Sequence, residues 1–323
     1  MKPKAYIAWP IPAEVENYLN RHCDCRKWSG DGPISYEQLK KEIGDAEGLL
    51  TGGIRVDAEL LRCAPGLRVV SNISAGYNNM DIEAMRQRNV IGTNNPGISD
   101  DSVADLVFGL ILASARNIAT LDRYVKQGCW KGELDRDLFG VDVHGATLGI
   151  IGLGGIGQQI AKRGIRGFNM NVLYFNRSRK PAAEAELGVQ YRPLNELLAL
   201  SDFVVVMLPL NKDTEHFIDS EHFQRMKRSA ILINASRGSV VREQALIHAL
   251  RTGQIRSAAL DVFEQEPVDP ENPLLQMDRV ITLPHVGSAT EKTRFNLMMS
   301  AARNLVSALN GETPQFLIRE FKS

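Results

Sequence analysis

The sequence has no excess of either charge, few cysteines and no long uninterrupted apolar run. Lys and Arg together number 38, and Asp and Glu also number 38. A chain without net charge has no overall field that would draw it to nucleic acid or to an anionic membrane. We therefore expect no nucleic-acid partner and no membrane partner, and any anion site must be local.

The four cysteines, Cys23, Cys25, Cys63 and Cys129, form no CxxC pair, and no histidine lies at zinc spacing from them. We therefore expect reduced thiols and no metal site. The apolar stretch 103–115 is interrupted by Asp105 and is too short to span a bilayer. Prolines interrupt the N-terminal apolar run, so it is unlike a signal peptide. These features favour a cytoplasmic location.

What the chain does contain is a regular alternation of short β-branched apolar runs with helical patterns, which is typical of α/β proteins with parallel sheets. The runs fall into two series, 5–9, 47–52, 67–74 and 90–93, then 147–152, 171–175, 203–208, 230–235, 257–262 and 279–284. A length of 323 residues is enough for about two domains. We expect two Rossmann-like domains, each a doubly wound parallel sheet.

Two long helical patterns flank the second series. One begins at Asp100 and Asp101, and the other follows Ser288 and Glu291, which form an S-x-x-E capping signature. The tail after the last strand can then return to the first domain. This layout predicts a discontinuous domain, 1–99 with 290–323, and a second domain over 100–289.

A glycine-rich motif directly follows the first expected strand of the second series and opens a helix. It reads Gly152, Leu153, Gly154, Gly155, Ile156 and Gly157. Its glycines allow a tight turn, close approach of backbone to a pyrophosphate, and close packing of the helix on the sheet. The N–H groups of the helix N-terminus suit phosphates. This context favours a dinucleotide site, with Gly152 and residues 154–157 binding the cofactor, over a merely tight turn.

About 20 residues after such a motif, an acidic residue usually binds the adenosine ribose. Here the corresponding stretch holds Asn176, Arg177, Ser178 and Arg179. An acid would repel a 2′-phosphate, whereas guanidinium and hydroxyl groups bind one. We therefore expect NADP(H) to be preferred, with NAD(H) possible. The alternative is a solvated basic turn that contacts no ligand.

Three further strand ends carry the residue types that reduction of a 2-keto acid requires. Ala235, Ser236 and Arg237 follow one strand, Asp261 and Glu266 the next, and His285 and Gly287 the last. Ligands of open α/β sheets lie beyond the carboxyl ends of the strands, so these groups are expected to meet near the nicotinamide. Arg237 can bind the substrate carboxylate, His285 can donate a proton to the keto oxygen, and Glu266 can orient its ring. Salt bridges and a structural histidine are the alternatives for each residue alone.

Several motifs together resemble the D-isomer-specific 2-hydroxyacid dehydrogenase family, in particular its glyoxylate/hydroxypyruvate reductase and 2-ketogluconate reductase branch. They are SAGYNNMD (74–81), NNPGISDDSVAD (94–105), GLGGIG (152–157), INASRGSVV (233–241), LDVFEQEP (260–267) and LPHVGSAT (283–290). The resemblance covers nearly the whole chain. It implies two Rossmann-like domains with an active-site cleft between them, and a homodimer.

The resemblance also implies residue roles. Arg237 and His285 match the substrate arginine and the acid/base histidine, and Glu266, rather than Glu264, matches the partner of that histidine. Backbone N–H groups of Ala75 and Gly76 match a substrate-carboxylate loop. Asp261 and Gly287 match residues on the nicotinamide side, and Leu208 and Pro209 match a loop beside the adenosine.

The expected activity is NADPH-dependent reduction of small 2-keto acids, namely glyoxylate, hydroxypyruvate or 2-keto-D-gluconate, to D-2-hydroxyacids. The loop of Gly52, Gly53 and Ile54 is small enough to admit a longer sugar acid. Two alternatives remain open at this point. One is a nucleotide-sensing regulatory protein on the same scaffold, and the other is a dehydrogenase acting on another D-2-hydroxyacid.

Overall fold

The computed structural model describes residues 1–30, 34–133 and 135–322. The chain forms two compact units, each described here by itself. Unit 1 comprises Met1–Ser99 with Ala289–Ser323, and unit 2 comprises Asp100–Ser288. Each unit has its own parallel sheet, of five and seven strands respectively. The expected fold class, two doubly wound α/β units, is confirmed.

Unit 1 is built on a sheet with the strand order β2-β1-β3-β4-β5. Its strands are β1 (Lys4–Ile7), β2 (Asp24–Lys27), β3 (Gly48–Thr51), β4 (Val69–Asn72) and β5 (Ile91–Thr93). All but β2 coincide with the expected apolar runs to within two residues. The sequence of β2, DCRK, lacks an apolar run because it lies at the edge of the sheet.

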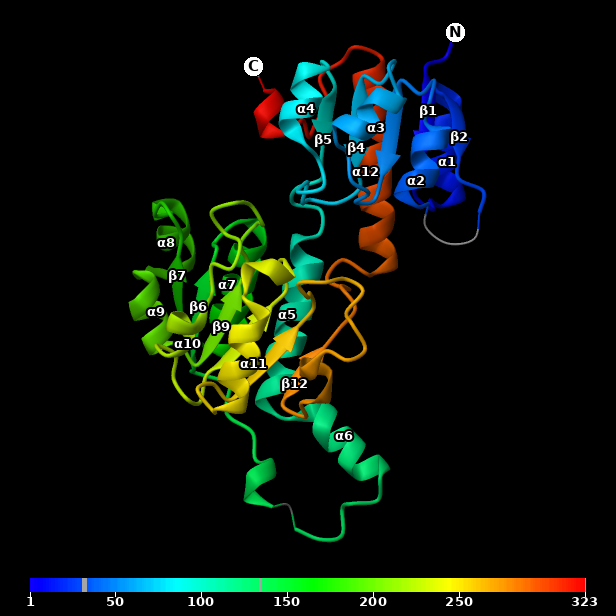
Figure 1. The fold of residues 1–323 in the computed structure, drawn as a ribbon. Helices are drawn as coiled ribbons and strands as arrows, with labels where there is room; N and C mark the ends of the chain where they lie inside the picture. Colours follow the sequence, from blue (N-terminus) through cyan, green and yellow to red (C-terminus); the bar gives the residue numbers. More distant parts are fainter. Residues whose placement is uncertain (31–33, 134, 323) are drawn as a thin grey trace. The chain divides into compact units, whose positions relative to one another are not determined.

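Helices cover both faces of this sheet: α1 (Ala13–His22), α2 (Tyr36–Glu42), α3 (Ala58–Cys63), α4 (Ile82–Gln87) and α12 (Glu291–Leu309). Alternate strand residues point to opposite faces. Tyr6 therefore packs in the core that holds Leu39 of α2, whereas Ile7 packs in the core that holds Leu305 of α12. In Figure 1 the orange helix α12 lies beside β4, so the C-terminal segment completes the core of the N-terminal sheet.

Unit 2 has the strand order β12-β11-β10-β9-β6-β7-β8. The strands are β6 (Thr147–Ile151), β7 (Asn171–Phe175), β8 (Gln190–Tyr191), β9 (Phe203–Val206), β10 (Ile231–Asn234), β11 (Ser257–Leu260) and β12 (Val280–Thr282). The short edge strand β8 is the one that the apolar runs do not predict. Because the order reverses between β6 and β9, this sheet has a topological switch point next to the glycine-rich motif.

The faces of the second sheet are covered by α5 (Asp100–Ala115), α7 (Gly155–Phe168), α8 (Pro181–Leu187), α9 (Leu194–Leu200), α10 (Ser220–Phe223) and α11 (Glu243–Arg251). Val205 packs in the core of α5 and α7, whereas Val204 packs in the core of α9 and α11. Helix α6 (Ile118–Lys126) follows α5 and buries no residue. A 3-10 turn, η1 (Arg136–Leu138), follows it.

The expected cap of the last helix is wrong by two residues. Helix α12 begins at Glu291, and Thr290, not Ser288, is its N-cap, with Oγ1 accepting a hydrogen bond from the amide of Thr293. The amides of Val286 and Gly287 donate to the carboxylate of Asp261. These bonds hold residues 286 and 287 at the end of the sheet, so the helix begins only after the chain has moved away from the sheet.

No single helix in the described residues is both long and apolar enough to cross a membrane. The pair α5 and α6, bent by 59°, passes the same test of length and composition. Helix α5 buries its apolar side chains in the core of unit 2.

Candidate active site

The glycine-rich turn after β6 needs glycine for steric reasons. Gly152 has a φ of +105°, and a Cβ there would lie 2.5 Å from the carbonyl oxygen of Met207. A Cβ on Gly157 would lie 2.4 Å from the carbonyl oxygen of Gly152. At Gly154, by contrast, no atom lies within 4 Å of the Cβ position. The turn is therefore closed toward the sheet and open on the side where a pyrophosphate would approach.

Helix α7 begins at Gly155 with Gly154 as N-cap and has no side-chain cap. A Cβ on Gly155 would lie 2.1 Å from Oδ2 of Asp100, so the carboxylate of Asp100 lies beside the first turn of α7. The N–H groups and the positive dipole end of a helix N-terminus suit an anion. These residues fit a dinucleotide phosphate.

Asn176, which stands at the position of the missing acid, is part of the turn itself. Its Oδ1 accepts a hydrogen bond of 2.8 Å from the amide of Leu153. It therefore holds the glycine-rich turn against the end of β7. If Asn176 also contacts the adenosine ribose, it does so while keeping its hydrogen bond to Leu153.

The two arginines of the basic turn have different surroundings. Arg179 pairs with Glu184, through Nη2 at 2.5 Å and Nε at 3.1 Å, and its guanidinium lies over the ring of Tyr191. Arg177 is 88% exposed, and its ion pair is with Asp213 at 3.7 Å. Ser178 is exposed. Arg177 and Ser178 are thus the more available groups for a 2′-phosphate.

Leu208 and Pro209 follow β9 at the same edge of the sheet and are not fully buried. The side chain of Leu208 lies 3.2 Å from the Cβ position of Gly152, beside the glycine-rich turn. The hydroxyl of Thr214 donates to the carbonyl of Pro209 and shapes the loop. Both residues are therefore close to the turn expected to hold the cofactor.

The turn after β10 is organised by Asn234, which is 1% exposed. Its Oδ1 accepts from the amide and the hydroxyl of Ser236, and its Nδ2 donates to the carbonyl of Arg237. A Cβ on Gly238 would lie 1.8 Å from the backbone of Phe263. This packing presses the turn that carries Ala235 and Arg237 against the segment that carries Glu266.

Arg237 is half-buried, and its Nη1 donates to the carbonyl of Ser236 at 2.7 Å. Burial lowers the pKa of the guanidinium, and the nearby charge of Glu266 opposes that effect. An arginine remains charged under such conditions because its ordinary pKa lies far above neutral pH. The side chain is a fixed cation at the carboxyl edge of the sheet.

His285 and Glu266 form a direct pair, with 2.7 Å between Nδ1 and Oε2. Partial burial opposes ionisation of Glu266, but the hydrogen bond with His285, the nearby positive charges and the amide of Phe263 outweigh it. The pKa of this carboxyl therefore lies below its usual value. With Glu266 ionised, Nδ1–H donates to it and Nε2 faces away from it. Glu264 instead pairs with His216, at 3.1 Å.

Asp261 is 1% exposed and organises the loop that carries His285. Its two carboxylate oxygens accept from the amides of Val286 (2.7 Å) and Gly287 (2.9 Å), and its carbonyl accepts from the amide of His285. His285 has a φ of +54°, an uncommon left-handed conformation that these bonds enforce. Burial raises the pKa of Asp261, and the two amide bonds oppose the rise.

In unit 1, Ala75 and Gly76 follow β4, and their carbonyl groups are held by asparagine side chains. Asn94 Nδ2 donates to Ala75, and Asn72 Nδ2 donates to Gly76, each at 2.7 Å. Sequence reasoning did not select these asparagines. Like Asn234, they stand where a buried strand ends, and that position is the signal that would have found them.

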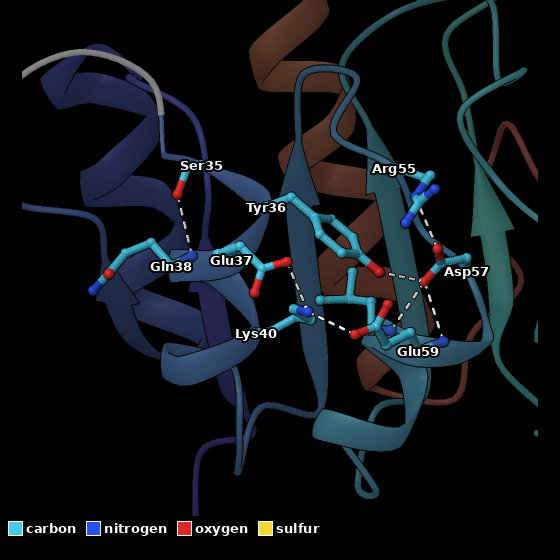
Figure 2. Close-up of polar contacts among 9 residues, drawn as sticks. Ser35, Tyr36, Glu37, Gln38, Lys40, Arg55, Asp57 and Glu59 are labelled. Carbon is cyan, nitrogen blue, oxygen red and sulfur yellow. Dashed lines mark hydrogen bonds and ion pairs between the residues drawn. The ribbon is translucent and has the colours of Figure 1, made fainter.

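The loop after β3, which holds Gly52, Gly53 and Ile54, is anchored from its far side. Figure 2 shows Tyr36 of α2 donating to Asp57 while Arg55 pairs with the same carboxylate, at 2.5 and 2.8 Å. The ring of Trp9 occupies the space that a Cβ on Gly52 would take, within 2.3 Å. The room left by that glycine is therefore filled by an indole.

In unit 2 the parallel strands bring the expected residues to one edge of one sheet, at and beside the switch point. Arg237, Glu266 and His285 lie on neighbouring strand ends, because β10, β11 and β12 are adjacent. Ala75 and Gly76 belong to the other unit. Within the described ranges, no group of three His, Cys, Asp or Glu side chains is arranged to hold a metal ion.

Comparison with known proteins agrees with this fold. Residues 108–287 match the family model of the D-isomer specific 2-hydroxyacid dehydrogenase, NAD binding domain. The chain belongs to the D-isomer specific 2-hydroxyacid dehydrogenases, a family of oxidoreductases, as its motifs predict.

Among its relatives is a glyoxylate/hydroxypyruvate reductase B from Erwinia tasmaniensis, 44% identical over 97% of both chains. A crystal structure of a protein from Thermus thermophilus has a TM-score of 0.90 and 34% identity over 98% of this chain and 99% of that one. An NADPH-dependent glyoxylate/hydroxypyruvate reductase from Sinorhizobium meliloti, in complex with NADP and malonate, has a TM-score of 0.87 and 28% identity. That match covers 99% of this chain and 98% of the other.

Proposed function

We propose that this protein reduces small 2-keto acids to D-2-hydroxyacids with NADPH. The observation that carries the proposal is the 2.7 Å pair of His285 and Glu266 on the strand next to the one that carries Arg237. In this proposal residues 100–289 bind the dinucleotide and supply Arg237, Glu266 and His285, and residues 1–99 with 290–323 form the substrate-binding domain. The family supports this class of reaction, and the names of the relatives support glyoxylate and hydroxypyruvate as substrates.

The chemistry divides between cofactor and protein. The reduced nicotinamide supplies a hydride to the keto carbon. Arg237 binds the substrate carboxylate with its planar guanidinium fork and so fixes which face of the keto group is presented. His285, protonated at both nitrogens, donates the Nε2 proton to the keto oxygen, so that the hydride and the proton together give the alcohol. Glu266 holds Nδ1 and stabilises the imidazolium before transfer.

The remaining edge residues are assigned to the cofactor and to the loops around it. We propose that residues 154–157 bind the pyrophosphate and that Asp261 and Gly287 lie on the nicotinamide side, with Ala235 and Ser236 next to them. Leu208 and Pro209 flank the adenosine. Arg177 and Ser178, supported by Arg179, bind the 2′-phosphate. The exposure of Arg177 and the absence of an acid at residue 176 support NADPH over NADH.

Among possible substrates, we propose glyoxylate and hydroxypyruvate ahead of 2-keto-D-gluconate. The indole of Trp9 fills the space beside Gly52, so the small residue there leaves no room for the longer chain of a sugar acid. A short keto acid such as glyoxylate does not need the space beside Gly52. The name of the Erwinia relative supports the same order.

One panel tests the proposal. Oxidation of NADPH and of NADH is followed with glyoxylate, hydroxypyruvate, pyruvate and 2-keto-D-gluconate, for the wild type and for His285→Ala. We expect NADPH-dependent turnover of the first two acids, and a loss of about a hundredfold or more in kcat for the variant with unchanged affinity for NADPH. Full activity of His285→Ala contradicts the mechanism. Binding of NADPH without reduction of any acid would instead favour a regulatory protein.

The same variant has a second readout that does not depend on turnover. Removing His285 removes the hydrogen bond that keeps the pKa of Glu266 low, while the burial that opposes ionisation remains. The carboxyl of Glu266 is therefore expected to titrate at higher pH in His285→Ala than in the wild type, as measured by carbon-13 NMR. An unchanged titration would show that the pair does not exist in solution.

We also propose a homodimer, joined through the segment 118–139, called the arm below. Four large apolar side chains among its described residues are exposed: Ile118 (52%), Val125 (53%), Trp130 (64%) and Phe139 (53%). Helix α6 within it has a marked apolar side and yet buries no residue in unit 2. Large apolar side chains gathered on one exposed segment are typical of a protein interface.

A further inference from the structure

The loop of Ala75 and Gly76 is held from one side by the segment that follows the neighbouring strand, β5. The amide of Asn95 donates to the carbonyl of Ser74 at 3.1 Å, and Asn94 Nδ2 donates to the carbonyl of Ala75 at 2.7 Å. Asn95 Nδ2 donates to the carbonyls of Asn72 and Ile73. Consecutive carbonyl groups of the loop are thus turned toward residues 94 and 95.

This arrangement decides where the N–H groups of the loop point. In a planar trans peptide the C=O and the following N–H point in opposite directions. Because the carbonyls of Ser74 and Ala75 face the 94–95 segment, the amides of Ala75 and Gly76 face away from it. Within the part of the chain that the structure describes, neither amide has a hydrogen-bond partner, and both residues are partly exposed. Two adjacent free amides on one side of a loop form a concave donor site for an anion.

We propose that Asn94 is a positioning residue that presets these two amides for the carboxylate of the substrate. This inference rests on the proposed function. Asn94 acts through the carbonyl of Ala75 and makes no contact with substrate itself. Without the bond from Nδ2, the Ala75–Gly76 peptide is free to rotate, and the two N–H groups no longer converge.

The chemistry of a carboxamide suits this task. Nδ2 is a donor without charge, so it binds the carbonyl while leaving the electrostatics of the anion site unchanged. A carboxylate of the same shape cannot donate when ionised, and it repels both the carbonyl and an incoming anion. Asn94 is only 9% exposed, which strengthens each of these effects.

The test is Asn94→Asp, with Asn17→Asp on the exposed side of α1 as a control that adds the same charge elsewhere in unit 1. At pH 8 we expect the KM for glyoxylate to rise about tenfold in Asn94→Asp, with kcat changed less than about twofold and the Kd of NADPH unchanged. As the pH falls, the introduced carboxyl gains a proton that it can donate to the Ala75 carbonyl. The ratio of kcat/KM between variant and wild type is therefore expected to recover toward pH 5.

Two further measurements keep the outcome decisive. Asn94→Ala, which adds no charge, is expected to raise KM about threefold without any recovery at low pH. Calorimetric binding of oxamate, an unreactive analogue of a 2-keto acid, reports on the anion site without turnover. If the wild type reduces no keto acid but Asn94→Asp still binds oxamate more weakly than the wild type does, the positioning role is upheld while the proposed function fails. Unchanged KM and unchanged oxamate affinity, or an equal loss in the Asn17→Asp control, overturn the inference.

Discussion

At the scale of single residues, Arg177 and Arg179 differ in how readily their guanidinium groups can bind a phosphate. The carboxylate of Glu184 already satisfies Arg179, and the hydroxyl of Tyr174 donates to that carboxylate. A phosphate that used Arg179 would have to compete with this carboxylate. Arg177 has only a distant, solvent-exposed ion pair to give up. Surface pairs of that kind contribute little, so Arg177 is easily recruited.

This difference gives a prediction for cofactor choice. Arg177→Ala is expected to raise the KM for NADPH about tenfold while leaving that for NADH unchanged, because only NADPH carries the 2′-phosphate. Glu184→Gln should lower the KM for NADPH by freeing Arg179. The measurement is the ratio of kcat/KM for the two cofactors. Arg228→Ala, an exposed arginine just before β10 at the opposite edge of the sheet, is the control. An unchanged ratio in Arg177→Ala would return the turn to a solvated role.

At the scale of elements, more of the candidate site residues lie at strand ends than on helices. β4 and β10 both end in a buried asparagine, and Asp261 follows β11 directly. Asn72 and Asn234 bind the backbone of the loop that follows their own strand, and Asp261 binds the backbone of the loop that follows β12. A buried polar residue at a strand end must find such partners, because an unpaired group there costs free energy. The loops of the candidate site are thus held in place by buried polar residues at the ends of the strands.

The start of α12 gives a prediction at this scale. Thr290→Ala removes the side-chain acceptor of the first turn and is expected to lower the free energy of unfolding by about 1 kcal/mol. Ser288→Ala, at the position that the S-x-x-E pattern indicates, is expected to have almost no effect. Urea unfolding of both variants checks this. A larger loss in Ser288→Ala would mean that the helix begins earlier in solution.

At the scale of the whole molecule, four of the exposed large apolar side chains belong to the arm, namely Ile118, Val125, Trp130 and Phe139. Light scattering after size exclusion is expected to give twice the chain mass of 35.8 kDa. The double variant Ile118→Asp with Val125→Asp should give a single chain mass, because charges cannot be buried in an apolar contact. Leu200→Asp, an equally exposed apolar residue outside the arm, is the control. A wild type of single chain mass would contradict the homodimer.

The sequence by itself determined the fold class and the glycine-rich turn, and it predicted which residues would carry the chemistry. Periodicity places apolar residues on sheet faces whatever the tertiary context, and only glycine satisfies the backbone at residues 152 and 157. The pairing of His285 with Glu266 rather than Glu264 also followed, from the motif that ends in Pro267.

Only the tertiary structure decided how those residues are held. Asn94 reaches Ala75, and Asp261 reaches Val286, because parallel strands bring segments far apart in the chain to the same sheet edge. The competition of Glu184 for Arg179, the filling of the Gly52 space by Trp9 and the shift of the α12 cap from Ser288 to Thr290 have the same origin. Local sequence preference allows either Ser288 or Thr290 to cap α12, and it allows Arg179 either to pair with a carboxylate or to bind a phosphate. In each case the tertiary contacts determine which alternative occurs.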